Sequence, residues 1–357
     1  MDDEASGRAS AARAARPTLA ELARVAGVNK STASRALRGY VTIAAATRLR
    51  IQQLARDLQY EPNASARRLF HARTDVLAFT VPSIRRGDAD SDPFLAELLD
   101  SVVHEASNHL LDVLVCRPQL GGAELDTYRR VVGGRHADGF IVMDLRPDDP
   151  RLAYLSAHGF PHVLFGRSQL ELELAHAYPY PWVEVDNRAG ARIGTEHLLA
   201  LGHQRIAFLG CGGVYTFELD RLAGYRDALA AAGIPFDDAL CTPSGVSQED
   251  GYRFTAELLA TANPPTAIFA VSDVLAVGAM RAVQDTRRTV GRAFPVMGFD
   301  GLGLGVYVQP QLTTLHQPIR KAGQALVQLL VAALQGAPPT HLLWPPELIV
   351  RASTVGG

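Results

Sequence analysis

The chain has 357 residues, of which 47% are hydrophobic and 20% charged, and its formal net charge is −2. This is the composition of an ordinary globular protein of two or three domains, and it excludes a fibrous or fully disordered chain. No apolar run approaches the roughly 20 residues that cross a membrane, and residues 1–17 lack the apolar core of a signal peptide. We therefore expect a soluble, cytoplasmic protein with no membrane partner.

The small net charge conceals two oppositely charged parts. Residues 1–73 hold 13 Lys and Arg against six Asp and Glu, whereas residues 74–357 hold 22 against 31. A basic head on an acidic body is typical of a nucleic-acid-binding module joined to a second function. A basic segment can also be no more than a solvated surface, so the local pattern has to decide.

The basic part begins with a polar tail, residues 1–17, which we expect to be disordered. Thr18 can cap a first helix that Gly27 ends, and Asn29 can cap a second helix over residues 30–37. The outward residues of the second helix are small, polar or basic, namely Lys30, Ser31, Ser34, Arg35 and Arg38. A third helix near residues 45–58 would turn these apolar residues inward: Leu49, Ile51, Leu54, Ala55 and Leu58. The first two helices form a helix-turn-helix, and a basic helical bundle is the alternative.

Residues 18–69 carry further ordered motifs: T-L-x-E-L-A, A-G-V, T-x-S-R-x-L and L-x-Y-x-P-N-x-x-A-x-x-L. With these motifs the segment closely resembles the DNA-binding head of the lactose-repressor (LacI/GalR) family. It departs from the family at Ala33, where a Val is usual, and at Arg38, where an Asn is usual.

The resemblance implies DNA contacts residue by residue. Lys30, Ser31 and Arg35 would face base edges in the major groove, where the planar fork of an arginine suits guanine. The other DNA-binding positions of the head are Thr18, Asn29, Thr32 and Ser34, of which the last three would contact phosphate. Residues 63–73 would hold the hinge helix of the family, with Asn63, Ala66 and Arg67 on the DNA and Leu69 as a wedge in the minor groove. Without the resemblance, residues 64–69 indicate only a short linker helix.

From residue 74 onward, apolar runs alternate with helical stretches. We expect strands at 76–82, 111–115, 139–143, 162–165, 182–186, 205–209, 266–271, 294–298 and 312–315. We expect helices near 93–109, 122–133, 150–158, 187–201, 219–232, 248–262, 273–285 and 318–335. This alternation predicts two doubly wound lobes with parallel sheets, and a ligand would bind in the cleft between them.

The motifs of the enzymes that use this architecture are missing from the sequence. The glycines at 210–213 and 301–305 do not have G-x-G-x-x-G spacing, and neither G-K-[ST] nor H-E-x-x-H occurs. Cys116, Cys211 and Cys241 are an odd, scattered set that fits neither a disulfide framework nor a zinc site. We therefore predict no enzymatic activity, no catalytic residue, no cofactor and no metal.

The body also carries D-G-F-I at 138–141, P-H-V-L-F-G-R at 161–167, V-D-N at 185–187 and G-F-D at 298–300. Over almost its whole length it resembles the effector-binding core of the same family, which is similar to periplasmic sugar-binding proteins. The resemblance implies an N-lobe of residues 74–183 and 318–340 and a C-lobe of residues 184–317 and 341–357. The chain would cross between the lobes near 182–186, 298–301 and 312–318.

The ligand positions of the family fall on six residues: Asp92, Phe94, Arg167, Arg221, Ser272 and Asp300. Arg221 and Asp300 would bind sugar hydroxyls, or else form a purely structural ion pair, and Phe94 would stack on a sugar face. Ser272 stands where the family often has Asn, and Gly166 where other members have Asp. The loop 83–93 is either the lip of this pocket or an ordinary loop.

These features predict a periplasmic-binding-protein-like α/β core of two doubly wound parallel-sheet lobes, residues 74–357, behind an all-α helix-turn-helix domain, residues 18–62. The expected function is sequence-specific repression of carbohydrate-utilisation genes, controlled by a small ligand, a sugar, in the cleft. The expected partners are a pseudo-palindromic double-stranded DNA operator, that effector and a second copy in a homodimer. A sugar-binding transport protein would leave the head unexplained, and a doubly wound soluble enzyme would need catalytic residues that we do not find.

Overall fold

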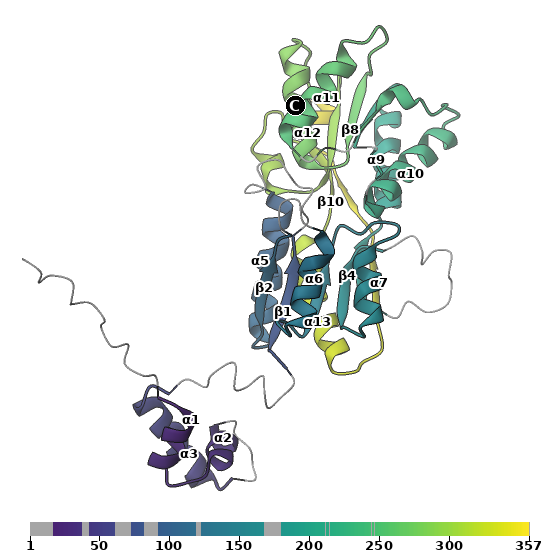
Figure 1. The fold of residues 1–357 in the computed structure, drawn as a ribbon. Coiled ribbons are helices and arrows are strands. Elements are labelled where there is room, and N and C mark those ends of the chain that lie inside the picture. Colours follow the sequence, from purple (N-terminus) through teal and green to yellow (C-terminus); the bar gives the residue numbers. More distant parts are fainter. Residues whose placement is uncertain are drawn as a thin grey trace, which may run out of the picture. The chain divides into compact units, whose positions relative to one another are not determined.

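The computed structural model describes residues 17–37, 43–60, 73–81, 92–118, 123–167, 180–210, 212–213, 215–243, 245 and 247–356. The chain divides into two compact units, Met1–Thr74 and Asp75–Gly357, which we call the head and the body (Figure 1). The predicted hinge, with Asn63, Ala66, Arg67 and Leu69, lies outside the described residues, as do most of loop 83–93 and Cys211.

The described part of the head has three helices: α1 (Leu19–Val25), α2 (Lys30–Leu37) and α3 (Ala45–Asp57). Both predicted caps are confirmed. The hydroxyl of Thr18 accepts the Glu21 N–H at 3.2 Å, and the side-chain oxygen of Asn29 accepts the Thr32 N–H at 2.7 Å. Gly27 follows α1 with a φ of 63°, a left-handed conformation that glycine adopts without strain and that ends the helix.

The head has a small apolar core, made by Leu22, Ala26, Ala36, Ile51 and Ala55. The expectation that Leu49 belongs to this core is wrong, because its side chain is 63% exposed. Ile51 and Ala55 define the buried stripe of α3, and a residue two positions away lies about 200° around the helix from Ile51. Leu49 therefore points to the opposite side.

The N-lobe of the body is a six-stranded sheet with the strand order β2-β1-β3-β4-β5-β11, all parallel. Its strands are β1 (Val76–Thr80), β2 (Asp112–Cys116), β3 (Gly139–Val142), β4 (His162–Phe165), β5 (Trp182–Val185) and β11 (His341–Trp344). Its helices are α5 (Pro93–Asn108), α6 (Glu124–Gly133), α7 (Pro150–Ala157) and α13 (Ile319–Leu334). One apolar cluster joins the sheet to α5 and α13, and a second cluster joins it to α6 and α7, so both faces are covered.

The C-lobe repeats this plan with the order β7-β6-β8-β9-β10-β12. Its strands are β6 (Ile206–Leu209), β7 (Cys241–Thr242), β8 (Ala267–Ala270), β9 (Val296–Asp300), β10 (Thr313–His316) and β12 (Glu347–Ile349), of which β12 is antiparallel to β10. Its helices are α9 (Asn187–Ala200), α10 (Thr216–Ala231), α11 (Gln248–Leu259), α12 (Asp273–Asp285), α14 (Ala352–Val355) and the 3₁₀ turns Asp238–Leu240 and Gly303–Val306. The helices pack closely: a Cβ on Gly224 of α10 would lie 2.0 Å from the Arg188 carbonyl oxygen of α9.

In each sheet the strand order reverses once, between β1 and β3 and between β6 and β8. Ligands of such sheets bind outside the carboxyl ends of the strands at this point. The N-lobe and C-lobe meet at these ends, so the fold places a binding cleft between them.

Two of the three predicted crossings between the lobes are confirmed, at Asp186 between β5 and α9 and at Gln317–Pro318 between β10 and α13. The crossing expected at 298–301 is wrong, because β9 and β10 are neighbours in the same sheet. The chain crosses instead at Pro345–Pro346, and β11 therefore belongs to the N-lobe, not the C-lobe. Proline has no N–H to donate, so this pair ends one sheet before the next begins.

No helix within the described ranges is long and apolar enough to cross a membrane. Two of the three cysteines are described and both are free thiols, Cys116 in the core and Cys241 partly buried.

Candidate functional site

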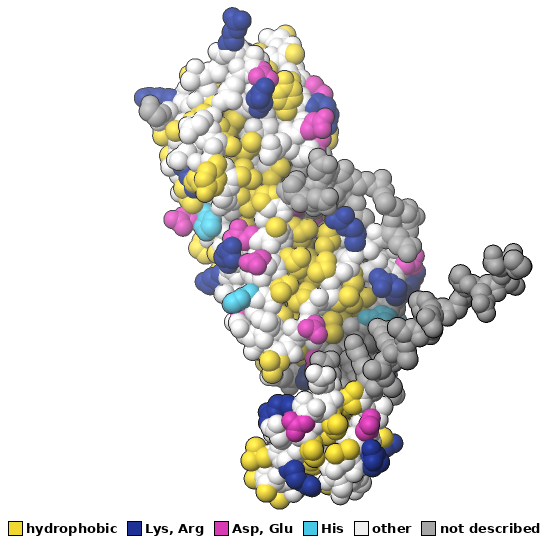
Figure 2. Space-filling view, turned by 90° about the vertical axis from the view of Figure 1, so that its left-hand side faces the viewer, with side chains coloured by type: hydrophobic (Ala, Val, Ile, Leu, Met, Phe, Trp, Pro, Cys, Tyr) yellow, Lys and Arg dark blue, Asp and Glu magenta, His cyan; other side chains and the backbone are white. Residues whose placement is uncertain are grey.

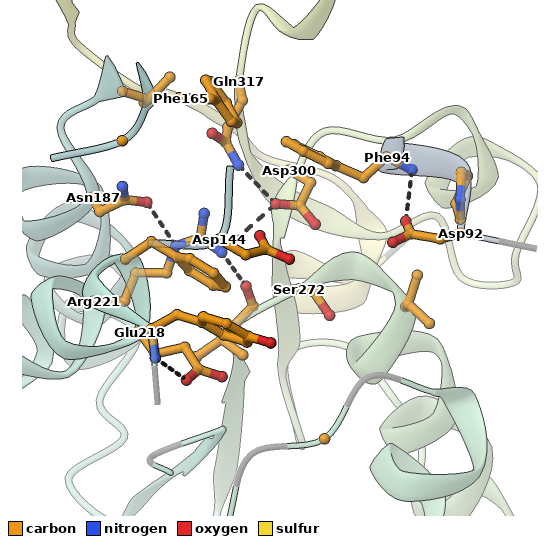
Figure 3. Close-up of a pocket in the computed structure, with 18 of the residues that line it drawn as sticks. Asp92, Phe94, Asp144, Phe165, Asn187, Glu218, Arg221, Ser272, Asp300 and Gln317 are labelled. Atoms are coloured by element: carbon orange, nitrogen blue, oxygen red, sulfur yellow. Dashed lines mark hydrogen bonds and ion pairs between the residues drawn. The ribbon is translucent and has the colours of Figure 1, made fainter. Parts of the chain in front are cut away.

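A cavity of about 490 Å³ lies between the two lobes (Figure 3). Its walls come from the N-termini of α5, α10, α11 and α12 and from the residues that follow β3, β4, β5, β9 and β10. The volume falls within the range of small-molecule sites in proteins. The cavity is therefore the candidate ligand site that the topology requires.

Five of the six residues predicted to bind ligand line this cavity: Asp92, Phe94, Arg221, Ser272 and Asp300. Phe94 packs its ring 5.9 Å from that of Phe165, and the two rings form an aromatic patch on the N-lobe wall. Ser272 caps α12 with its hydroxyl, which accepts the Leu275 N–H at 3.3 Å.

Arg167 is the exception, because it is not among the residues that line the cavity. Its Nε donates to the Glu184 carboxylate, and its Nη2 lies 4.0 Å from Asp220 of α10. Arg167 follows β4 in the N-lobe, and Asp220 belongs to the C-lobe. Arg167 thus bridges the two lobes beside the cavity. At this point of the wall the preceding residue, Gly166, lines the cavity instead.

Arg221 reaches the cavity from α10 and is only 4% exposed. Its Nε donates to the side-chain oxygen of Asn187 at 2.8 Å, and Nη1 donates to the Val271 carbonyl oxygen and lies 3.6 Å from Asp300 Oδ1 (Figure 3). Its guanidinium lies 3.6 Å from the centre of the Phe299 ring. Burial lowers the pKa of Arg221 from its ordinary value, and the Asp300 charge opposes this shift.

Asp300 ends β9, and its backbone φ of 124° is a value that residues other than glycine rarely adopt. Its carboxylate accepts Gln317 Nε2 at 2.8 Å besides facing Arg221. Backbone strain of this kind is concentrated at functional sites. Arg221 and Asp300 thus form the ion pair that the sequence offered as the alternative to sugar binding. Both side chains also line the cavity, so the ion pair does not exclude a ligand contact.

Glu184, which was not predicted from the sequence, lines the cavity from β5 and is 2% exposed. Its carboxylate accepts hydrogen bonds from Arg167 Nε and, at 3.1 Å, from Asn187 Nδ2. Burial raises the pKa of Glu184 to about 7, although the Arg167 charge lowers it. A charged residue inside the apolar strand W-V-E-V was the signal that could have identified it.

Other lining residues also went unpredicted: Asp144, Phe165, Asn187, Tyr215, Phe217, Glu218 and Gln317. Asp144, Asn187 and Gln317 come directly after or within two residues of the ends of β3, β5 and β10. Polar residues at carboxyl ends of parallel strands are the signal that could have found these three.

The lobes touch each other around the cavity. The Thr216 N–H of α10 donates to the Leu145 carbonyl oxygen of the N-lobe at 2.9 Å. Leu302, in the segment after β9, is buried in the apolar cluster of the N-lobe. Asp273, at the start of α12, fixes the position of the segment after β9, because its carboxylate accepts the Leu302 N–H at 2.7 Å. Burial and the Asp300 charge raise the pKa of Asp273.

In the head, Lys30, Ser31 and Arg35 lie exposed on α2, while Ala33 and Ala36 of the same helix are buried. The second helix of the head thus presents the polar, basic face that the sequence analysis predicted. In the described part of the chain, no group of three or more His, Cys, Asp or Glu side chains could hold a metal ion.

Comparisons with known proteins agree with this division of the chain. Residues 18–63 match the family model of bacterial regulatory proteins, lacI family, and residues 195–354 match that of a periplasmic binding protein-like domain. The HTH-type transcriptional regulator AglR of Rhizobium meliloti is 34% identical over 94% of this chain and 94% of its own. The HTH-type transcriptional regulator CelR of Thermobifida fusca is 32% identical over 96% of this chain and 99% of its own.

Solved structures show the same likeness. The complex of the transcriptional regulator CelR with cellobiose is 30% identical, with a TM-score of 0.70, over 95% of this chain and 100% of that chain. The lac repressor dimer bound to operator and the anti-inducer ONPF is 26% identical, with a TM-score of 0.80, over 95% of this chain and 99% of that chain.

Proposed function

The chain belongs to the lacI family of bacterial transcriptional regulators, and we propose that it is a repressor whose affinity for an operator is controlled by a sugar bound between its lobes. One observation carries this proposal. A single chain joins a helix-turn-helix with an exposed basic face to a body that encloses Arg221 and Asp300 in an interlobe cavity.

The DNA-binding role falls to α2. Lys30, Ser31 and Arg35 lie exposed on this helix, and Arg35 has the geometry to donate two hydrogen bonds to one guanine. Asn29 and Thr18 stand at the N-termini of α2 and α1, where backbone N–H groups favour phosphate. Thr32, Ser34 and the hinge positions Asn63, Ala66, Arg67 and Leu69 complete the proposed DNA-binding set.

The effector role falls to the cavity. Asp300 and Arg221 offer an acceptor and a donor side by side, an arrangement that suits neighbouring hydroxyls of a sugar. Phe94 and Phe165 form an apolar patch that suits the face of a sugar ring. The cellobiose bound to the related CelR supports a sugar as the class of effector.

The proposed mechanism is a shift between two arrangements of the lobes. A ligand that contacts both walls binds one arrangement better than the other and so shifts the population toward it. Three contacts between the lobes would change: the hydrogen bond from the Thr216 N–H to the Leu145 carbonyl oxygen, the Arg167–Asp220 contact, and the packing of Leu302 in the apolar cluster of the N-lobe. In a dimer, such a shift alters the spacing of the two heads on DNA.

A homodimer is part of the proposal. Hydrophobic side chains are visible on the side of the body where α5, β2 and α12 lie (Figure 2). Val103 of α5 is 46% exposed and Val115 of the edge strand β2 is 45% exposed. An exposed apolar surface on a regulator of this kind is typical of a subunit interface, and the related lac repressor was solved as a dimer on its operator.

The test separates the two sites. An operator is selected from random DNA with the full-length protein, and a panel of mono- and disaccharides is screened for a change in operator affinity. The double variant Lys30→Ala, Arg35→Ala is expected to lose operator binding and to keep the thermal shift caused by the active sugar. Arg221→Met is expected to keep operator binding and to lose the thermal shift caused by the sugar. If no sugar alters operator binding by the wild type, the proposed control is wrong.

A further inference from the structure

Given the function proposed above, the charge of the cavity defines the kind of sugar that it accepts. Six acidic side chains line it: Asp92, Asp144, Glu184, Glu218, Glu249 and Asp300. Glu184 contributes the least negative charge, because burial raises its pKa to about 7. Among the lining residues that the structure describes, Arg221 alone carries a positive charge at neutral pH. These carboxylates come from both lobes, so a ligand between the lobes meets negative charge on either side.

Arg221 is already engaged within the protein. Its guanidinium donates to Asn187 and to the Val271 carbonyl oxygen, and it lies 3.6 Å from Asp300. Binding of a phosphate or a carboxylate normally uses the fork of an arginine or the ammonium of a lysine. Because Nε and Nη1 are engaged in this way, Arg221 cannot turn its fork to an anion without giving up contacts that its burial makes costly to break.

Helix N-termini are the second source of anion affinity, because their N–H groups and dipole favour negative charge. Several helices begin at the cavity, but at each of them a side chain of the protein already accepts at least one N–H group at or just before the first turn. Those side chains are Asp92 at α5, Asp186 at α9, Glu218 at α10, Ser247 at α11 and Ser272 at α12. Three of the five are carboxylates, which oppose a further anion.

The charges behind the wall do not change this balance. Arg167 is paired with Glu184 and lies 4.0 Å from Asp220, so Arg167 and Glu184 together add no net charge, and five lining carboxylates remain against Arg221. Asp186 adds a further carboxylate at the N-terminus of α9, whereas burial and the Asp300 charge raise the pKa of Asp273 and so disfavour its charged form. Residues 82–91, outside the described ranges, have two Arg and two Asp in their sequence and so no net charge.

We propose that the cavity selects its effector by charge: it binds an uncharged mono- or disaccharide and excludes sugar phosphates and sugar acids. Carboxylates accept hydrogen bonds, and a neutral sugar presents hydroxyl donors on every side. A phosphate or a carboxylate group presents only acceptors to a wall that also presents acceptors, and it adds a like charge to the cavity. An ammonium group in place of one hydroxyl keeps the donors, so an amino sugar is accepted.

The experiment uses the full-length protein and a matched set of sugars. Calorimetry measures the Kd of the neutral sugar that binds best and of its 6-phosphate, its uronic acid and its amine. We expect the phosphate and the uronic acid to bind at least tenfold more weakly than the neutral sugar, and the amine to bind within about threefold of it. A phosphate or uronic acid that binds as tightly as the neutral sugar overturns the inference and leaves the proposed function standing.

A charge-reversal variant distinguishes charge from shape. Glu249 lines the cavity and is exposed, whereas Glu257 lies on the same helix and does not line it. The ratio of the Kd of the 6-phosphate to the Kd of the neutral sugar is expected to fall at least threefold in Glu249→Lys. In Glu257→Lys this ratio is expected to stay unchanged. An equal effect of the two substitutions, or no effect of Glu249→Lys, shows that charge in the cavity does not exclude the phosphate. Failure of every sugar to bind refutes the proposed function itself.

Discussion

Glu184 is buried in a strand with a pKa raised from 4.5 to about 7, and this makes the stability of the N-lobe depend on pH in a defined direction. In the unfolded chain the carboxyl loses its proton near its ordinary pKa, while in the folded chain it keeps the proton until about pH 7. Between these values the folded state binds more protons, so the free energy of unfolding falls as the pH rises. At about 1.4 kcal/mol per pH unit, the loss amounts to about 3 kcal/mol.

Glu184→Gln isolates this contribution because glutamine does not titrate. Relative to this variant, the wild type is expected to lose about 3 kcal/mol between pH 4.5 and pH 7.5, and little beyond. Groups that titrate alike in both proteins cancel in the difference. The attraction between Arg167 and the ionised carboxyl is already contained in the pKa of about 7. Altered packing and hydrogen bonding in the variant add an offset that is independent of pH, so the prediction concerns only the slope.

Denaturant unfolding followed by tryptophan fluorescence measures this slope. The two tryptophans of the chain, Trp182 and Trp344, lie on β5 and β11, in the same sheet as Glu184. Glu249→Gln, which removes an exposed carboxylate from the same cavity, is the control and should differ from the wild type by no more than about 0.5 kcal/mol at every pH. A difference between wild type and Glu184→Gln that is flat with pH, or that favours the wild type as the pH rises, would refute the reasoning.

Three further predictions concern DNA binding and assembly. Operator affinity should fall steeply with salt, with a log–log slope of about −4 or steeper, because the basic head displaces counterions from phosphates; a flat plot contradicts this. Arg35→Ala should weaken operator binding by about 1–3 kcal/mol and random DNA by less, and equal losses would make Arg35 a phosphate contact. Sedimentation equilibrium at micromolar concentration should give twice the chain mass of 38.4 kDa, and a monomer or a tetramer would contradict the dimer.

The regular elements of this fold were predictable because each satisfies local rules. Thr18 and Asn29 cap helices that begin where the sequence places them, and α12 covers residues 273–285 as expected. The short elements were not predictable in this way. β11 and β12 have few residues and are partly exposed, so their apolar pattern is weak, and their place is set by pairing with β5 and β10.

The candidate site was predictable in part for a similar reason. Asp92, Arg221 and Asp300 could be placed by resemblance, but the position of Arg167 depends on where its long side chain ends. It ends on Glu184, which the sequence analysis did not consider. Contacts between residues on different strands, and the burial that raises the pKa of Glu184, exist only once the lobes have formed.

The measurement that tests the central claim most directly is the operator affinity of the full-length protein with and without its sugar, in the wild type and in Asp300→Asn. Asp300 lines the interlobe cavity and belongs to a different unit from the head. We expect the sugar to change the operator Kd of the wild type at least tenfold. Without sugar, Asp300→Asn should bind operator within about threefold of the wild type, and the sugar should leave its Kd unchanged. A variant that responds to the sugar as fully as the wild type would show that this cavity does not control the head.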